Sequence, residues 1–271
     1  MPPGRPECHD ARGASPVWAA TGCTYGLHIA SPFPSVSPKN DAELVQPARN
    51  GTLWVLATAR EAGVRRVVMT SSTAAVAYGR GGREKPFTEA DWSDETNRSD
   101  QSGYERSKTI AERAAWTWME QQGHALELVT ICPGAVLGPD RSASIDIIAR
   151  LLEGSLPGLA RFGWPLVDVR DVAALHLLAM TDPRAAGQRY LAAGDFAWMS
   201  DIAGVLRERV PRRTQPSPLV RASGLVDRAV RSRLYELGKH RAVTAEKARL
   251  ELGWTPRSNE DAIVATAQSL A

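Results

Sequence analysis

Short apolar runs alternate with helical patterns over the first half of the chain. Residues 24–30, 65–71 and 126–132 are rich in apolar side chains, and Ser, Pro or Gly residues close or interrupt the chain near the end of each run. Apolar runs of this length between turn signals predict strands that are buried inside a sheet.

The segments between these runs repeat their apolar positions with the period of an α-helix. Residues 41–62 form one predicted helix, which Pro47 is expected to kink or restart and Gly63 to end. Residues 103–122, with Ala at positions 111, 114 and 115, form a second long helix. This alternation of strand and helix predicts an α/β fold with a Rossmann-like, doubly wound parallel sheet.

The pattern becomes looser past residue 140. Short helical stretches dominate 141–271, and further strands are predicted near 166–169 and 189–193, where they can join the main core. We therefore expect a smaller, mainly helical lobe after the sheet.

Composition narrows the class of protein. A content of 43% hydrophobic residues in 271 positions can supply a buried core. The net charge is only +3 and no block of Lys and Arg stands out, so we expect neither a nucleic-acid partner nor a membrane surface. No apolar run approaches the roughly 20 residues that cross a bilayer, and the first residues lack the apolar core of a signal peptide. A cytoplasmic protein is expected.

The cysteines do not indicate a metal site or a disulfide framework. Cys8, Cys23 and Cys132 form no Cys-x-x-Cys pair and have no metal-ligand spacing with the five histidines. We therefore predict no bound metal.

The pair of Tyr104 and Lys108 is the first candidate for chemistry. The two residues lie four positions apart on the predicted 103–122 helix, so their side chains share one face. A phenol can donate a proton to a carbonyl oxygen, and the nearby ammonium is expected to lower the phenol pKa. The spacing alone is weak evidence, because an exposed Tyr near a solvated Lys is common on helices.

The ends of the predicted strands strengthen this candidate. Thr70 and Ser72 lie at the end of the second strand, Gly134 at the end of the third, and Ser31 at the end of the first. Ligands bind at the carboxyl ends of strands in open parallel sheets, so these residues are expected to converge near Tyr104. A hydroxyl there can bond a substrate oxygen, and Gly134 allows close approach to a ring because it has no Cβ. Each is also a common turn residue.

Eight stretches resemble, in order, blocks of the dihydroflavonol-reductase-like aldehyde and ketone reductases. This is a branch of the extended short-chain dehydrogenase/reductase group within the NAD-dependent epimerase/dehydratase family. The stretches are HIASPFP, QPARNGTLWVL, VRRVVMTSS, TEADWSD, YERSKTIAERAAW, CPGAVLGP, VDVRDVAALHLLAM and LGWTP. The resemblance implies a Rossmann domain with a substrate lobe, NADP(H) rather than NAD(H) as the cofactor, and a small carbonyl compound as the substrate. It leaves the oligomeric state open.

The resemblance also assigns roles to residues. It implies that Tyr104 donates a proton, that Lys108 modulates it and holds the nicotinamide ribose, and that Ser72 rather than Ser71 bonds the substrate oxygen. The implied cofactor contacts are Ala30, Ser31, Thr70, Tyr104, Lys108, Pro133, Gly134 and Val136. His28 is expected to be a core histidine bonded to a backbone group, and Asp168 and Asp171 to be structural rather than catalytic carboxylates.

The Gly-rich, phosphate-binding turn that opens a Rossmann domain is not found. Gly4, Gly13, Gly22 and Gly26 lack its spacing, and the 24–30 run resembles the fourth strand of the family. Three divisions are expected: a disordered or misframed stretch over 1–20, the remaining part of the NAD(P)-binding domain over 21–140, and mainly the substrate lobe over 141–271.

The expected function is therefore NADP(H)-dependent reduction of an aldehyde or ketone. One alternative is a truncated, non-enzymatic remnant that cannot bind the dinucleotide. Under either interpretation, the 271-residue chain alone is expected to fold poorly and to bind no NADP(H), because the Gly-rich turn is not found and the 24–30 strand has an unpaired edge. The other alternative is a sugar-nucleotide epimerase or dehydratase, which shares the Tyr and Lys pair. The TEADWSD and AERAAW blocks favour the reductase.

Overall fold

A computed structural model describes most of the chain. The described residues are 16–31, 38, 40–122, 126–139, 145–154, 156, 158–206, 215–223, 225, 231 and 233–270. Most of the 1–20 stretch that was expected to be disordered or misframed lies outside them. Its last part forms a short helix, α1 (Pro16–Ala20), which the sequence pattern did not predict.

In the described part of the chain, the main sheet contains four parallel strands in the order β1-β2-β3-β6. They are β1 (Tyr25–His28), β2 (Arg66–Thr70), β3 (Glu127–Pro133) and β6 (Arg189–Ala192). The strands predicted over 24–30, 65–71, 126–132 and 189–193 are all present. With helices on both faces, this sheet confirms the α/β, Rossmann-like fold class.

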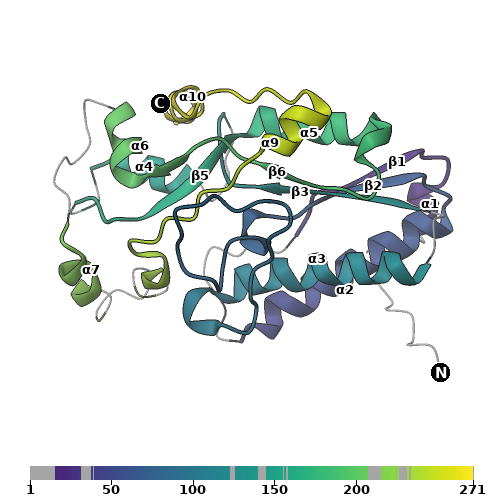
Figure 1. Cartoon of the computed structure of the whole chain (residues 1–271), viewed down its shortest axis with the longest axis horizontal. Helices are drawn as coiled ribbons and strands as arrows, with labels where there is room; N and C mark the ends of the chain where they lie inside the picture. The colour runs from purple at the N-terminus through teal and green to yellow at the C-terminus, as the bar shows by residue number, and fades with distance from the viewer. Residues whose placement is uncertain are drawn as a thin grey trace.

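Helices cover both faces of the sheet. Figure 1 shows α2 (Ala42–Glu61) and α3 (Gly103–Gln122) on one face, and α5 (Val169–Thr181) and α9 (Glu246–Leu252) on the other. Side chains along β2 point alternately to the two faces of the sheet. Val68 packs in the hydrophobic cluster with α5 and α9, while Val67 and Met69 pack in the cluster with α2 and α3.

The first strand differs from the expectation. The 24–30 run was predicted to be buried, but Leu27 is 45% exposed and Ile29 is 61% exposed. The reason is position, since β1 is the outermost of the described strands and pairs only with β2 among them.

The helix α2 is continuous although Pro47 lies inside it, so the proline does not restart the helix. Gly63 ends it as predicted. Its φ of 75° is in the left-handed region, and Val64 N donates to Ala59 O at 2.9 Å, which closes the helix end.

A second, smaller sheet has strands in the order β4-β5-β7 among the described residues. They are β4 (Ala135–Leu137), β5 (Gly163–Asp168) and β7 (Phe196–Trp198), with β5 parallel to β4 and antiparallel to β7. The strand predicted near 166–169 is thus in this sheet rather than in the main one. The helices around it are α4 (Asp146–Leu152), α6 (Met199–Leu206), α7 (Ser217–Ser223) and α10 (Asn259–Ser269).

The polar loop of residues 79–101, which precedes α3, is tied to the C-terminal part of the chain. Its backbone pairs with the segment before α9, where Phe87 N donates to Ala242 O at 2.8 Å and Thr244 N donates to Phe87 O at 2.9 Å. Short 3-10 turns complete the fold at η1 (Thr73–Ala75), η2 (Arg98–Asp100), η4 (Pro183–Ala185) and η5 (Leu234–Glu236). In the described part of the chain no helix has the length and apolar character needed to cross a membrane.

Candidate active site

The carboxyl ends of three parallel strands meet along one edge of the main sheet. His28 on β1 pairs with Met69 on β2, and Met69 pairs with Thr130 on β3. Residues that follow these strands, including Ser72 and Gly134, are therefore neighbours at this edge. The helix α3 contacts η1, which begins directly after Ser72.

A capping box fixes the first turn of α3. Tyr104 N donates to Ser102 Oγ at 3.2 Å, and Ser102 N donates to Glu105 Oε2 at 2.7 Å. The Ser102 hydroxyl also bonds the Glu105 carboxylate. This reciprocal pattern satisfies backbone donors that a helix start leaves unpaired, and it holds Tyr104 in an ordered turn.

The start of α3 also packs closely on the start of α2. A Cβ on Gly103 would lie 2.5 Å from Asp41 Oδ1, so only glycine fits at this position without a shift. About one helical turn after Gly103, Arg106 forms an ion pair with Asp41. The two long helices are thus locked together beside Tyr104.

Ser71 and Ser72 have different partners. Ser71 is buried and its hydroxyl donates to Glu112 Oε2 at 2.6 Å. Ser72 Oγ accepts from Ala74 N at 3.1 Å, and a hydrogen bond joins its side chain to Tyr104. The structure therefore brings Ser72 to Tyr104 and turns Ser71 toward the core.

Burial dominates the acidity of Tyr104. It raises the pKa of the phenol to about 12, with a further increase from the charge of Glu105, while the hydrogen bond from Ser72 acts to lower it. The expectation that Lys108 lowers this pKa is therefore wrong. Lys108 is not among the groups that shift the Tyr104 pKa, although its ammonium lies 5.7 Å from the centre of the Tyr104 ring. Tyr104 is protonated at neutral pH.

Lys108 is the buried cation of the site. Its side chain is on the same face of α3 as Tyr104, and the residue is 8% exposed. Burial lowers the pKa of the ammonium to about 8, against the opposing effects of Cys132 and Glu112. It is mainly protonated at pH 7, but close to titration.

The predicted cofactor contacts lie at or just beyond the strand ends, but their side chains differ in direction. Thr70 Oγ1 is 2.7 Å from His176 Nε2 of α5, so this hydroxyl is on the face of the sheet opposite α3. Ser31 is half-buried and Ala30 is exposed beyond β1. Val136 is half-buried on β4 and packs against the main core.

The Pro133–Gly134 turn has a reason of its own to contain glycine. A Cβ on Gly134 would lie 2.2 Å from Pro165 O, because β5 approaches the chain closely here. Gly134 N also donates to Ala192 O at 3.1 Å, which joins the turn to the end of β6. The close approach at Gly134 is thus to the protein's own backbone, at the strand end where a nicotinamide contact was predicted.

His28 differs from the expected core histidine. It is half-buried, and its Nε2 lies 3.5 Å from the hydroxyl of Thr52 rather than bonding a backbone group of the described chain. Burial lowers its pKa, and the charge of Lys108 lowers it further. A neutral imidazole therefore faces the same edge as Lys108.

The two aspartates near β5 hold α5 in place. Asp168 caps the helix by accepting from Arg170 N at 2.8 Å, and it also pairs with the Arg170 guanidinium. Asp171 accepts from Arg257 N at 2.7 Å and forms an ion pair with that side chain. Both carboxylates thus have structural partners: Asp168 bonds the start of α5, and Asp171 bonds Arg257.

Two polar networks were not predicted from the sequence. One surrounds Glu112 in the core. The other links the C-terminal lobe to α3, because Tyr235 OH donates to Glu105 Oε1 at 3.0 Å and Trp164 Nε1 donates to Glu236 Oε2 at 2.7 Å. For the network around Glu112, the only signal in the sequence was that Glu112 lies one turn after Lys108, among alanines on the buried face of a helix.

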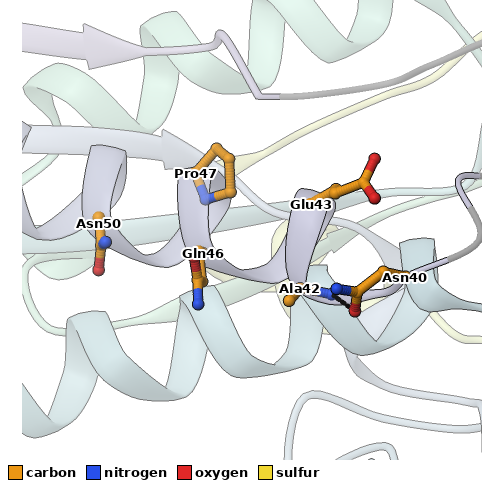
Figure 2. Close-up of a pocket in the computed structure, with 6 residues that line it drawn as sticks. All are labelled: Asn40, Ala42, Glu43, Gln46, Pro47 and Asn50. Atoms are coloured by element: carbon orange, nitrogen blue, oxygen red, sulfur yellow. Dashed lines mark hydrogen bonds between the residues drawn. The ribbon is translucent and has the colours of Figure 1, made fainter.

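A shallow cavity of about 450 Å³ lies along the first half of α2 (Figure 2). Its lining consists of Asn40, Ala42, Glu43, Gln46, Pro47 and Asn50. Asn40 Oδ1 accepts a hydrogen bond from Ala42 N at 3.0 Å, so this side chain is already bonded to the backbone at the start of α2. None of the residues predicted for the active site lines this cavity.

Sequence comparisons place the chain in a family. A family model described as "NAD dependent epimerase/dehydratase family" matches residues 14–193. A cinnamoyl-CoA reductase of Medicago truncatula is 38% identical over 209 residues, covering 72% of this chain and 61% of the relative. A dihydroflavonol 4-reductase of Zea mays is 32% identical over 209 residues, covering 73% and 57%. The chain thus spans less than two thirds of the length of these relatives.

Solved structures agree with the fold. The yeast methylglyoxal/isovaleraldehyde reductase Gre2, complexed with NADPH, has a TM-score of 0.76 at 26% identity, covering 94% of this chain and 78% of that one. MoeE5, in complex with UDP-glucuronic acid and NAD, has a TM-score of 0.72 at 19% identity over 96% and 83%, a likeness of fold alone. The resemblance seen in the sequence is confirmed, and the chain belongs to the NAD-dependent epimerase/dehydratase family.

Proposed function

We propose that this chain carries the reaction centre of an NADP(H)-dependent reductase that converts an aldehyde or ketone to an alcohol. The observation that carries the proposal is the constellation of Ser72, Tyr104 and Lys108 at the carboxyl edge of a parallel sheet. The names of the Medicago and Zea relatives, both reductases, support the reaction class.

Each of the three residues has a distinct task in this proposal. The Ser72 hydroxyl is oriented by Ala74 N and donates to the substrate oxygen. Tyr104 gives its phenolic proton to the same oxygen as the carbonyl is reduced, and a pKa of about 12 keeps that proton available at neutral pH. The Lys108 ammonium offsets the negative charge that then develops on the phenol oxygen.

The residues present fit the nicotinamide half of a dinucleotide. Lys108 offers buried N–H donors of the kind that ribose hydroxyls accept, next to Tyr104 and at the edge where open α/β sheets bind ligands. When bound, the dinucleotide supplies the hydride. NADPH in the Gre2 complex supports NADP(H) as the form used. The described residues offer no comparable donor set for the adenosine phosphates.

A sugar-nucleotide epimerase or dehydratase is the competing reaction class. Both classes use a Tyr and Lys pair, and MoeE5 shares the fold with this chain. The reductase is favoured because relatives at 38% and 32% identity are named as reductases. Net consumption of the cofactor separates the classes, since an epimerase returns its hydride to the same substrate.

The test is a steady-state assay of NADPH oxidation with a panel of aldehydes and ketones. Turnover with at least one carbonyl compound, lost in Tyr104→Phe, is the expected result. NADPH binding without consumption, together with conversion of a nucleotide sugar, would replace the reductase by the epimerase. Absence of dinucleotide binding, measured by quenching of Trp fluorescence, would favour a non-enzymatic role.

A further inference from the structure

A single buried carboxylate connects the parts of the site. Glu112 on α3 is 0% exposed and accepts hydrogen bonds from five side chains. The donors are Ser71 Oγ at 2.6 Å, Thr130 Oγ1 at 2.8 Å, Arg189 Nε and Nη2 at 2.7 and 3.1 Å, Trp116 Nε1 at 3.3 Å, and Cys132 Sγ at 3.7 Å. They come from β2's end, β3, β6 and α3 itself.

This carboxylate is ionised despite its burial. Burial alone would raise the pKa of Glu112, but the charge and hydrogen bonds of Arg189, helped by the Ser71 and Thr130 hydroxyls, hold it below its ordinary value. A buried ion pair is a poor device for stability, because desolvation of both charges opposes their attraction. Glu112 is therefore expected to have a role other than stabilising the fold.

The position of Glu112 is at the junction of the two elements that carry the site. Tyr104, Lys108 and Glu112 are spaced four residues apart on α3, so they follow one another along one face of the helix. Ser71, which bonds Glu112, directly precedes Ser72. The bond between Ser71 and Glu112 thus joins the strand end that carries Ser72 to the helix that carries Tyr104 and Lys108.

Arg189 extends the junction to the neighbouring loop. Its Nη1 donates to Glu89 O at 2.8 Å and Asp91 O at 2.9 Å, and its guanidinium lies 3.7 Å from the centre of the Trp92 ring. The arginine is therefore anchored independently of Glu112, which makes the carboxylate position well defined.

Glu112 is also the relevant negative charge for Lys108. The titratable groups around the ammonium are Tyr104 and Glu112 on α3, His28 on β1 and Cys132 on β3, with Arg189 on β6 behind Glu112. Tyr104 and His28 are neutral at pH 7, and burial raises the pKa of Cys132, so its thiol is neutral too. Cys132 and Glu112 both act to raise the Lys108 pKa, Cys132 the more strongly, and Glu112 is the one of the two that is ionised.

We propose that Glu112 is a positioning residue that aligns the Ser72 strand end with the Tyr104 helix and keeps Lys108 in its ammonium form. The meaning of this role for catalysis rests on the reductase function proposed above. The role itself is a property of the cofactor-free protein, so it is tested without substrate or dinucleotide.

The experiment is an NMR titration of the 271-residue protein with ¹³C-labelled lysine side chains. The chain has five lysines, and Lys108→Arg identifies the Lys108 signal by its absence. The wild-type midpoint is expected at about pH 8. Glu112→Gln keeps the side-chain shape and removes the charge, and it is expected to lower the Lys108 midpoint by about one pH unit or more. An unchanged midpoint in a folded Glu112→Gln protein would overturn the proposal.

A matched control distinguishes a specific effect of the Glu112 charge on Lys108 from the general effect of removing a buried carboxylate. Asp171→Asn removes a buried carboxylate of α5 that pairs with Arg257 in the segment before α10, and the Lys108 midpoint should stay at its wild-type value. If it moves as far as in Glu112→Gln, the effect is not specific to Glu112 and the proposal fails.

A second variant covers the case in which Glu112→Gln does not fold because it leaves Arg189 unpaired. The double variant Glu112→Gln/Arg189→Met removes both charges, a change that buried pairs often tolerate. Its Lys108 midpoint is expected to fall as well, because Arg189 is not among the groups that shift the Lys108 pKa. If neither variant folds, Glu112 serves the stability of the fold and the proposal is overturned.

Discussion

Ser71 and Ser72 are consecutive in the chain, yet their hydroxyl groups are bonded on different sides of the strand end. The Ser71 hydroxyl donates to the buried Glu112 at 2.6 Å, whereas the Ser72 side chain is hydrogen-bonded to Tyr104. Neighbouring residues of an extended chain point in opposite directions, so the two serines cannot exchange tasks.

We expect the two alanine substitutions to have separate effects. Ser72→Ala removes a donor to the substrate oxygen and should reduce kcat about 10²-fold or more with little change in the melting temperature. Ser71→Ala leaves Glu112 short of one donor and should destabilise the fold by about 1–3 kcal/mol. Steady-state kinetics and thermal unfolding of both variants measure this. A larger loss of kcat from Ser71→Ala would reverse the assignment.

Loss of the phenol should remove turnover but not binding. Tyr104→Phe is expected to lower the rate of carbonyl reduction by about 10²- to 10⁴-fold, because general acid catalysis is worth that much, while NADPH affinity stays within a few fold. Lys108→Ala should damage both. Turnover assays beside a fluorescence titration with NADPH distinguish them, and retention of more than about a tenth of the activity by Tyr104→Phe would contradict its role as proton donor.

The pH dependence of cofactor binding should follow Lys108. Its folded-state pKa of about 8 is below the ordinary 10.5, so the ammonium is present below pH 8 and is lost as pH rises through that value. The KM for NADPH is therefore expected to rise above about pH 8, and Lys108→Arg, which keeps its charge, should not show the rise. Unfolding does not explain such a rise. Between pH 8 and 10.5 the unfolded chain binds the Lys108 proton more tightly than the folded chain does, so the contribution of Lys108 to the free energy of unfolding increases with pH.

Local patterns were sufficient to predict the main elements. The strands β2 and β3 and the helices α2 and α3 follow the expected ranges closely, because a run of apolar residues or a 3.6-residue period is visible within ten to twenty positions. The strands β4 and β7 have three residues each and leave no such pattern. The exposure of Leu27 depends on the place of β1 at the side of the sheet, which periodicity does not contain.

The candidate site was predictable only where its residues are close in the chain. Tyr104 and Lys108 lie one helical turn apart, so their partnership is visible in the sequence. The contact of Arg189 with Glu112 joins positions 77 residues apart, and that of Tyr235 with Glu105 joins positions 130 apart. Such pairs are created by chain folding. The raised pKa of Tyr104 has the same origin, because burial is a property of the whole fold.

A methyl group at position 134 should destabilise the fold. In Gly134→Ala the new Cβ would meet Pro165 O at 2.2 Å, and relief of that clash requires β4 or β5 to move. We expect a loss of about 1–3 kcal/mol, as for other overpacked positions. Gly51→Ala on α2 is the matched control, because nothing lies within 4 Å of its added Cβ and helix propensity favours alanine. Chemical denaturation of both variants gives the comparison.

The open side of β1 should promote self-association. Leu27 is 45% exposed on the outermost described strand, where backbone N–H and C=O groups can pair with another chain. Leu27→Lys is expected to reduce light scattering when the protein is concentrated. Leu250→Lys introduces the same charge on the helix α9, at a residue that is 74% exposed and belongs to no strand, and it should have little effect. Equal improvement by both substitutions would indicate a simple effect of net charge.

The bond between Tyr235 and Glu105 has a consequence for attempts to change substrate preference. Glu105 closes the first helical turn around Tyr104 and at the same time accepts a hydrogen bond from the hydroxyl of Tyr235 in the C-terminal lobe. A chimaera that takes this lobe from a relative must therefore bring a hydroxyl to the same place, or the turn that holds the phenol loses one of its restraints. Transplanted lobes should be chosen for that donor before they are chosen for the shape of their binding surface.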